Sequence, residues 1–507
     1  MEINHLTPAE RRVWRAFPRG ETVDFRTAGD GSAGGADGTG GEGGTEGEGG
    51  TGGEGGAAWG PERTLRASVV KALLISGPQV EGEVPALRVC GARVTGPLDL
   101  THAVIDTPVR LSHCHFTDPP EFYGAQLRRL SLRGSSLPAL DLGSVRIEGV
   151  LQLSECRMRG RIQLAGAQIA GALFLARAEL TTQDPTKAAL RLDGATVGED
   201  IWAPGVRATG EIRLNGATVN GSVDLSDARL DPAEGLALDA QKATVEGDML
   251  LKRARIRGWI GLRGARVTGR LDLSYVDLAK PGAAVLRANN ATVGQLWLRK
   301  GPPVDGRISL RHTQIDVLFL EPEKVPGTVY LESLVYTSLI PNEPAARRLP
   351  LVERDGDGYV PYAYEQLTAA YRRNGDEDSA RRVQLAKQRR HRATLAWYGR
   401  AWGHVQDAAV GYGFRPLRAC GWLLSLLVIG TVAFTVHRPR PLKPAEAPEF
   451  DPFFYTLDLL LPVISFGQEP AFAPDGVFQK LSYVLVLAGW ILASTVIAGV
   501  TRVVNRQ

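Results

Sequence analysis

Residues 149–180 read GVLQLSECRMRGRIQLAGAQIAGALFLARAEL, and this stretch decides the expected fold. It holds three copies of one phrase: a glycine, any residue, an aliphatic residue, any residue and a leucine. The copies begin eleven residues apart, at Gly149, Gly160 and Gly171, and the phrase recurs from about Leu87 to Leu331. A short phrase repeated at a fixed interval is typical of repeat proteins.

A second phrase, alanine, any residue and an aliphatic residue, begins three residues after many of the leucines, as at Ala167 and Ala178. Within each phrase the period is two, so both apolar side chains point to one face of a short strand. Gly or Ala then marks the tight turns. Two eleven-residue units would close one coil, and about eleven stacked coils would form a rod roughly 50 Å long. We therefore predict a mainly β fold, a right-handed β-helix solenoid over residues 81–340.

This repeat resembles that of the pentapeptide-repeat and related right-handed β-helix proteins, in which a central leucine and a small alanine mark each face. The resemblance implies a square cross-section. Here Asp or Asn does not regularly precede the leucine, and units of five and six residues alternate, so a three-sided coil is the alternative. The interruptions at 181–187, 231–232 and 280–282 are expected to be loops that bulge from one coil and could bind a protein partner.

The residues before the solenoid fall into three segments. Residues 1–27 predict a short amphipathic docking segment, with Thr7 as helix N-cap and Pro8 at the first helical position. Residues 28–60 are rich in Gly and Glu and predict a disordered insertion. Residues 61–80 return to helical spacing and predict a capping helix for the solenoid.

Residues 341–416 predict a helical juxtamembrane region. A helical hairpin is expected from Tyr364 to Arg373 and from Asp376 to about Trp397. Its outer face is basic and is expected to contact anionic lipid headgroups, since each Lys or Arg near such a surface contributes about 1 kcal/mol. The six candidate residues are Arg381, Arg382, Lys387, Arg389, Arg390 and Arg392.

Residues 417–507 contain two long apolar runs, 419–436 and 481–501, neither of which has a charged residue. Both are long enough for a transmembrane helix. Arginines before the first run and after the second place both termini in the cytoplasm. The sequence thus predicts a multi-pass protein of the plasma membrane with a cytoplasmic solenoid.

Between these runs, residues 453–466 read FFYTLDLLLPVISF, which is apolar and too short to span. Two alternatives follow. This segment is a re-entrant pore loop, with Asp458, Ser465, Phe466 and Gly467 at the pore, or it is an interfacial helix that closes a hairpin.

We find no catalytic, metal or cofactor motif. His113-Cys114-His115 could supply metal ligands, but on a strand the two histidines share one side and Cys114 does not, and a surface turn is the alternative. The recurring aspartates, Asp99, Asp193, Asp224, Asp248 and Asp272, are expected in outward columns. The net charge is +4, and acidic and basic residues of the repeat nearly balance, which argues against nucleic acid as a partner.

The chain as a whole resembles a group of actinobacterial proteins usually labelled membrane-associated oxidoreductase. The resemblance rests on LTPAERRVWRAFPRGETVDFR, the repeated GxIxL units, YEQLTAAYRRNG, GYGFRPLRA and FFYTLDLLLPVISFGQE. It implies a redox activity, for which the sequence shows no flavin, nicotinamide, haem or iron–sulfur signature.

The leading functional hypothesis from the sequence is a non-catalytic, membrane-anchored scaffold or sensor. The first alternative is a two-span pore-loop channel, which would require a homo-oligomer. The second alternative is the oxidoreductase that the family label implies.

Overall fold

The structure is a computed structural model of the 507-residue chain. It describes residues 5–26, 56–182, 184, 187–232, 235–397, 416–443, 447–461 and 465–504. Most of the predicted Gly-rich insertion, and the end of the predicted juxtamembrane region, lie outside the described residues. The chain divides into two compact units, residues 1–366 and 367–507, and each is described by itself.

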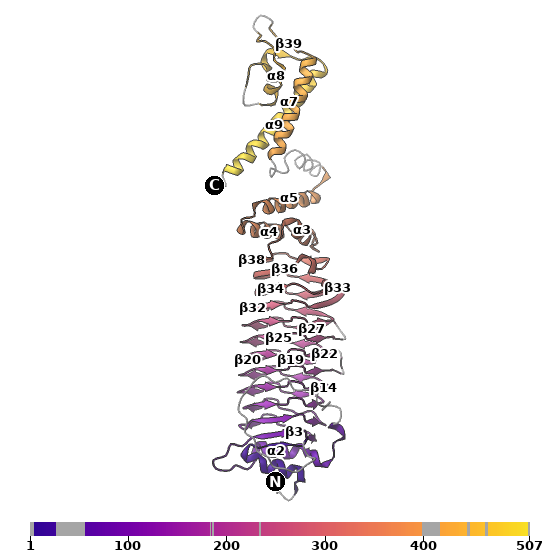
Figure 1. Cartoon of the computed structure of the whole chain (residues 1–507), viewed down its shortest axis with the longest axis vertical. Helices are drawn as coiled ribbons and strands as arrows, with labels where there is room; N and C mark the ends of the chain where they lie inside the picture. The colour runs from indigo at the N-terminus through magenta and orange to yellow at the C-terminus, as the bar shows by residue number, and fades with distance from the viewer. Residues whose placement is uncertain are drawn as a thin grey trace. The chain divides into compact units, whose positions relative to one another are not determined.

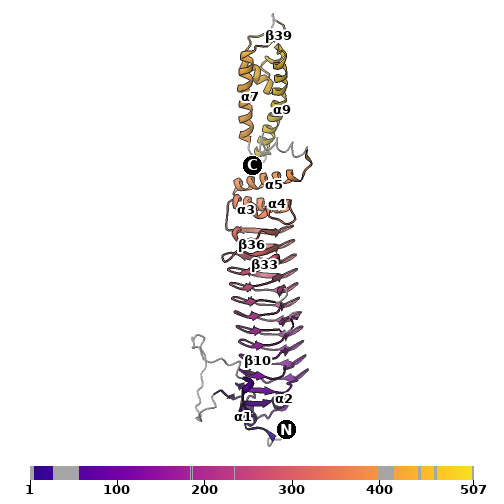
Figure 2. The ribbon, with the colours of Figure 1, turned by 90° about the vertical axis from the view of Figure 1, so that its right-hand side faces the viewer.

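The first unit is a parallel β-solenoid of about 11 turns (Figures 1 and 2). In its regular part each coil has four short strands, such as β12 (Arg146–Ile147), β13 (Leu151–Gln152), β14 (Arg157–Met158) and β15 (Ile162–Gln163). Each pairs in parallel with its equivalent one coil further on, as β12 does with β16 (Gln168–Ile169). These coils are therefore four-sided, and of the two cross-sections left open by the sequence the three-sided one is excluded.

We number the four faces in chain order within a coil. Face 1 consists of β5 (Val104–Ile105), β8 (Gln126–Leu127), β12, β16, β20 (Thr196–Val197), β24 (Thr218–Val219) and β28 (Thr244–Val245). Face 2 consists of β1 (Thr22–Asp24), β3 (Leu87–Cys90), β6 (Val109–Ser112), β9 (Leu130–Ser131), β13, β17 (Leu173–Phe174), β21 (Ile201–Trp202), β25 (Val223–Asp224) and β29 (Met249–Leu250).

Face 3 consists of β2 (Thr64–Arg66), β4 (Arg93–Thr95), β7 (His115–Phe116), β10 (Ser136–Leu137), β14, β18 (Glu179–Leu180), β22 (Arg207–Ala208), β26 (Arg229–Leu230) and β30 (Arg255–Ile256). Face 4 consists of β11 (Leu140–Asp141), β15, β19 (Leu190–Arg191), β23 (Ile212–Arg213), β27 (Leu236–Asp239) and β31 (Trp259–Gly261).

In the last coils neighbouring faces merge into longer strands. Faces 1 and 2 continue as β32 (Arg266–Asp272), β34 (Thr292–Leu298), β36 (Gln314–Leu320) and β38 (Val335–Ile340). Faces 3 and 4 join in β33 (Asp277–Arg287), which is followed by β35 (Asp305–Ser309) and β37 (Thr328–Tyr330).

The core of the solenoid is a set of apolar ladders along its axis. The predicted inward residues Leu151, Leu153, Ile162 and Leu164 are all fully buried. Each such side chain contributes about 1.5–3 kcal/mol through burial. Because the next residue along each strand points outward, one period-two pattern fixes both the core and the outer surface.

The tight turns do not lie at the Gly and Ala of the two repeated phrases, where the sequence predicted them. After each leucine the chain turns through a residue with positive φ, such as Gly166 (φ +66°) or Arg177 (φ +55°), and the following alanine N–H bonds back to the leucine carbonyl. The glycine of the repeated phrase serves another purpose. At Gly171 a Cβ would lie 2.9 Å from the carbonyl oxygen of Gly149 one coil earlier, so close stacking of the backbones requires glycine there.

The N-terminal end of the solenoid is closed by α1 (Pro8–Ala16), two 3-10 turns at 17–19 and 61–63, and α2 (Ala67–Ser76). Thr7 and Glu10 form a capping box on α1. β1 pairs with β3 through Thr22, Val23 and Asp24, so this short strand extends face 2. The buried Glu10 carboxylate accepts hydrogen bonds from the Arg66 side chain and backbone N–H. A further 3-10 turn spans 56–58.

At the other end of the solenoid a 3-10 turn (322–324) and α3 (Ala345–Glu353) follow. The fully buried Arg348 donates hydrogen bonds to the carbonyl oxygens of Leu320 and Pro341. Asp355 accepts from the Leu331 N–H at 3.0 Å. Helix α4 (Pro361–Arg373) contains the boundary between the two units.

The second unit contains α5 (Glu377–Thr394), α7 (Pro416–Val436), α8 (Pro452–Leu460), α9 (Val477–Val504), a 3-10 turn at 469–471, and the strand pair β39 (Arg440–Pro441) and β40 (Phe472–Ala473). In the predicted hairpin, Gln384 of α5 donates to Thr368 of α4 at 3.1 Å. Leu367, Ala370, Val383 and Leu385 are buried.

The prediction of two transmembrane helices, and with it the multi-pass location in the plasma membrane, is wrong. Among the described residues, no helix combines the length and the apolar character needed to cross a bilayer. The prediction rested on the length of the uncharged runs in α7 and α9. In the structure, part of the apolar surface of these helices packs inside the unit. Phe434 of α7 and Leu485 of α9 join Tyr455, Leu459 and Leu460 of α8 in one buried cluster.

Candidate anion-binding groove

The first coils carry arginines on the outer side of face 2. Arg88 of β3 and Arg110 of β6 are register partners in adjacent coils, and Ser131 of β9 is the next partner of Arg110. Neighbouring strands lie about 4.8 Å apart, so the two arginines are stacked directly along the axis. Arg129 comes two residues before Ser131, immediately ahead of β9.

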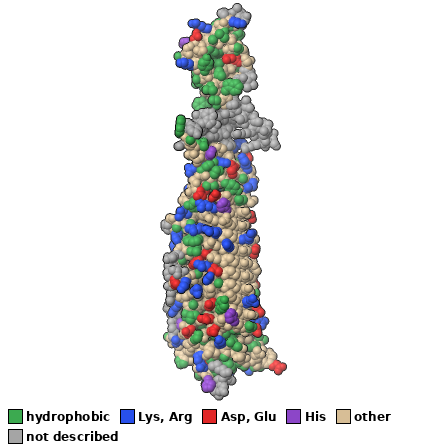
Figure 3. Space-filling view, turned by 180° about the vertical axis from the view of Figure 1, so that it is seen from behind, with side chains coloured by type: hydrophobic (Ala, Val, Ile, Leu, Met, Phe, Trp, Pro, Cys, Tyr) green, Lys and Arg blue, Asp and Glu red, His purple; other side chains and the backbone are tan. Residues whose placement is uncertain are grey.

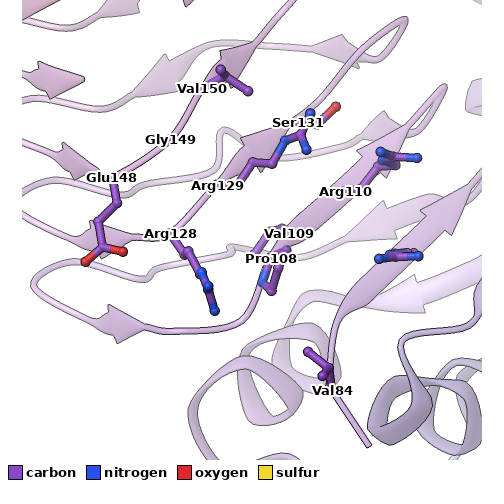
Figure 4. Close-up of a pocket in the computed structure, with 11 residues that line it drawn as sticks. Val84, Pro108, Val109, Arg110, Arg128, Arg129, Ser131, Glu148, Gly149 and Val150 are labelled. Atoms are coloured by element: carbon purple, nitrogen blue, oxygen red, sulfur yellow. The ribbon is translucent and has the colours of Figure 1, made fainter. Parts of the chain in front are cut away.

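These residues line a hollow of about 630 Å³, which we call the arginine groove. Figure 4 shows Arg110, Arg129 and Ser131 on neighbouring strands of the face, with Arg128 and Glu148 at the corner beside them. Its complete lining consists of Val84, Arg88, Pro108, Val109, Arg110, Arg128, Arg129, Ser131, Glu148, Gly149 and Val150. Four arginines face one glutamate, so the groove has a net charge of +3.

Within the described part of the chain, the four guanidinium groups of the groove form no ion pair and no hydrogen bond with protein groups. Burial lowers the pKa of the Arg110 guanidinium from its ordinary value, and the positive charges of Arg129 and Arg88 lower it further. Arginine nevertheless stays protonated in proteins. The groove therefore concentrates positive charge that the described residues do not neutralise.

A second hollow, of about 450 Å³, adjoins the groove and shares Arg110, Arg129 and Ser131 with it. Its own cations are paired: Arg26 with Asp24 at 2.9 Å, and Arg133 with Glu155 at 3.2 Å. The buried side-chain oxygen of Gln152 has no hydrogen-bond partner there. The positive field of the face thus continues beside the groove, partly offset by carboxylates.

Elsewhere on the solenoid, arginines alternate with carboxylates across the coils. Glu155 bridges Arg133 and Arg177, and Glu179 lies between Arg157 and Arg207 on face 3. Figure 3 shows basic and acidic side chains interleaved over the solenoid surface. Further pairs are Arg191–Asp193, Arg213–Glu211, Arg253–Asp227, Arg257–Asp277 and Arg311–Asp357. A run of three arginines on face 3, Arg207, Arg229 and Arg255, is bracketed in register by Glu179 and Asp277.

The two histidines considered as metal ligands lie apart. His113 is a turn residue with φ +51° and lines the hollow beside the groove, whereas His115 begins β7 on face 3 and lines a different hollow of about 540 Å³. The strand geometry, in which the two histidines share one side, is wrong because the chain turns a corner between them, and the turn that the sequence offered as the alternative is found at His113. Within the described residues, no cluster of His, Cys, Asp or Glu could hold a metal ion.

Three of the five recurring aspartates, Asp99, Asp224 and Asp272, hold turns together. Asp224 and Asp272 are largely buried, and each accepts a hydrogen bond at 2.8 Å from the N–H of the serine two residues on. Asp99 makes the same contact with the N–H of Thr101. These carboxylates organise the backbone locally, which explains their recurrence without paired-carboxylate chemistry.

Three of the four cysteines are buried thiols. Burial raises the pKa of Cys114 and of Cys156 to about 12. Both thiols point at backbone carbonyl oxygens, Cys156 at that of Leu132 at 2.9 Å. A thiol held in this way is not the thiolate that nucleophilic or redox chemistry needs.

The residues of the predicted pore loop form a small hydrogen-bonded loop. The Asp458 carboxylate accepts from the backbone N–H groups of Phe466, Gln468 and Glu469. The Ser465 hydroxyl accepts from the N–H of Gly467, whose φ is +80°. Among the described residues, no helix on either side of this loop has the length and apolar character needed to cross a membrane, and the assignment of these residues to a pore stays a prediction.

The six basic residues predicted to contact lipid all lie on α5. Arg381, Arg382, Arg389 and Arg390 are exposed, while Lys387 and Arg392 are half-buried. Arg381 is paired weakly with Asp378 at 3.9 Å. Their contact with anionic headgroups stays a prediction.

The arginine groove was not found from the sequence. Arg88 and Arg110 are separated by one coil length, and stacking the chain in its coils would have aligned them.

No protein-family model matches the chain, and no curated protein shows significant similarity to it.

Proposed function

We propose that this protein is a non-catalytic β-solenoid scaffold that binds an anionic ligand in the arginine groove. The observation that carries the proposal is the stacking of Arg88 and Arg110 next to Arg129, without a carboxylate partner among the described residues. Guanidinium groups present planar forks of N–H donors that fit carboxylate and phosphate oxygens. A rigid surface that holds several such forks together at a net charge of +3 attracts anions at the expense of its own stability.

The fold supports a binding role. The parallel pairing of β3, β6 and β9, together with the fully buried Leu87, Val109 and Leu130, fixes the groove residues on rigid strands. The aspartates and cysteines that could suggest chemistry are instead held in turns and in the core. The right-handed winding, a protein partner on the solenoid loops, self-association and the redox activity implied by the family resemblance stay predictions.

The proposal is tested with two triple variants of equal charge. In the first, Arg88, Arg110 and Arg129 are each replaced by Gln. In the control, the exposed and scattered Arg15, Arg146 and Arg266 are replaced by Gln. We expect the groove variant to elute from phosphocellulose at clearly lower salt than the control, because clustered charges bind a polyanion cooperatively while scattered ones do not. Equal elution of the two variants would overturn the proposal.

A further inference from the structure

The ligand of the arginine groove can be specified by its chemistry, and this step rests on the proposed function. We propose that the groove binds an oligophosphate, that is, two or three linked phosphoryl groups, either inorganic or as the phosphate chain of an organic metabolite.

The charge of the groove matches such a ligand. Arg88, Arg110, Arg128 and Arg129 together with Glu148 give a net charge of +3. A phosphoryl group carries roughly −1.5 to −2 near neutral pH, so about two groups balance the site. A single carboxylate leaves most of the positive charge unpaired, which is the costly state in a partly desolvated hollow.

The extent of the groove along the axis also favours a chain of anions. Arg88 and Arg110 lie on consecutive coils, and Arg129 immediately precedes the strand of the next coil. Two coil steps correspond to about 10 Å, given a strand spacing of about 4.8 Å. Linked phosphoryl groups offer oxygens along this line of arginines, so that all three guanidinium groups can be contacted without the outer two bending toward one point.

The remaining lining suits a phosphate ester or anhydride. The largely buried Ser131 adds a hydroxyl donor at the register position next to Arg110. Val84, Pro108 and Val150 form an apolar edge to the same hollow, against which an uncharged remainder of a metabolite could pack. A volume of about 630 Å³ falls within the range of roughly 300–1,000 Å³ typical of small-molecule sites.

The test is calorimetric titration of the full-length protein at low ionic strength with tripolyphosphate, pyrophosphate, orthophosphate and citrate. We expect affinity to fall from tripolyphosphate to pyrophosphate to orthophosphate, and we expect citrate to bind more weakly than pyrophosphate in spite of its similar charge. Arg110→Gln should weaken tripolyphosphate binding by about ten- to a hundredfold, because it removes a charged hydrogen-bonding fork from the centre of the site. Arg146→Gln, on face 1, should change it by less than about twofold.

Further arms separate the possible outcomes. Arg110→Lys keeps the charge and removes the fork, so it should bind tripolyphosphate more weakly than the native chain while unfolding at the same temperature. Tighter binding of ADP than of pyrophosphate would identify a nucleotide source through the apolar edge, and equal binding an inorganic one. Citrate binding as tightly as tripolyphosphate would overturn the oligophosphate inference but leave the anion-binding function intact. An absence of binding to every anion would overturn both.

Discussion

Two parts of the solenoid use the same residue type on the same framework in opposite ways. On face 3, Arg157 and Arg207 flank Glu179, and each lies within 3.4 Å of its carboxylate. On face 2, Arg88 and Arg110 stack against each other, with Arg129 alongside. In the first region the charges of arginine and glutamate neutralise each other, so no further partner is needed. In the second region the positive charge is not neutralised by the described residues and can attract an anionic ligand. This difference distinguishes a stabilising ladder of ion pairs from the proposed binding site.

The two regions share the inward ladder, so its disruption should give the largest effect and affect both equally. We expect Leu151→Ala to lower the free energy of unfolding by about 2–5 kcal/mol, because Leu151 is fully buried between register partners in both neighbouring coils. The matched control, Gln152→Ala, changes the outward neighbour and should cost less than about 1 kcal/mol. Denaturant unfolding monitored by circular dichroism measures both, and equal losses would contradict this account of the core.

The second prediction converts one region into the other. Arg88→Glu places a carboxylate in register with Arg110, which recreates the alternation of face 3. Tripolyphosphate binding should fall by about a hundredfold or more, because a repulsive charge replaces an attractive one beside the central Arg110. The unfolding free energy should stay within about 1 kcal/mol of that of the native chain, as for exposed ion pairs in general. Retained binding would show that the ligand does not use this stack.

The third prediction concerns the cap that precedes the arginine groove. Burial of Glu10 alone would raise its pKa, but hydrogen bonds from Arg66 and from the Thr7 N–H outweigh it and hold the pKa below its usual value. The resulting stability is complete above about pH 4.5 and is lost as the pH falls through the lowered pKa of the folded state. Glu10→Gln should cost about 1–2 kcal/mol at pH 7 and little at acidic pH. Unfolding measured from pH 7 to pH 3 checks this, and a loss that is independent of pH would contradict it.

The smallest expected effect concerns Glu155, at the edge of the groove. Glu155→Gln releases Arg133, which lines the adjoining hollow, and should strengthen tripolyphosphate binding about two- to fivefold through the added positive potential. Glu179→Gln releases Arg157 and Arg207 on face 3 and should leave the affinity unchanged. Stability should change by less than about 1 kcal/mol in both variants. If both variants gained equally, general charge rather than the groove would control binding.

The solenoid was predictable because its pattern is local. The period of two within each phrase and the eleven-residue repeat identify the buried Leu151, Ile162 and Leu173 without knowledge of the fold. The role of Gly171 was not predictable in the same way, since it depends on the carbonyl oxygen of Gly149 in another coil. Likewise, the number of faces depends on how the coils close, which the repeat length alone left open.

The arginine groove escaped sequence reasoning for a related reason. Arg88 and Arg110 are 22 residues apart, whereas Glu179 and Arg207, also register partners, are 28 apart because residues 181–187 interrupt the repeat. The alignment of Arg88 with Arg110 follows from the regular 22-residue coil, but coil lengths vary elsewhere, and the period alone does not show that Arg129 lines the same hollow. The apolar runs at 419–436 and 481–501 led to the wrong prediction of transmembrane helices. Hydropathy shows that a run is apolar, but it does not show which of its residues pack against α8.

The most direct test of the difference between the two regions measures both in one sample. The full-length protein is treated with an arginine-selective dicarbonyl reagent, with and without tripolyphosphate, and the modified residues are quantified by mass spectrometry. We predict that Arg88, Arg110 and Arg129 react faster than the carboxylate-paired Arg157 and Arg207, and that tripolyphosphate protects the first set alone. Equal reactivity of the two sets, or protection that does not distinguish them, would contradict the claim that face 2 holds an anion site.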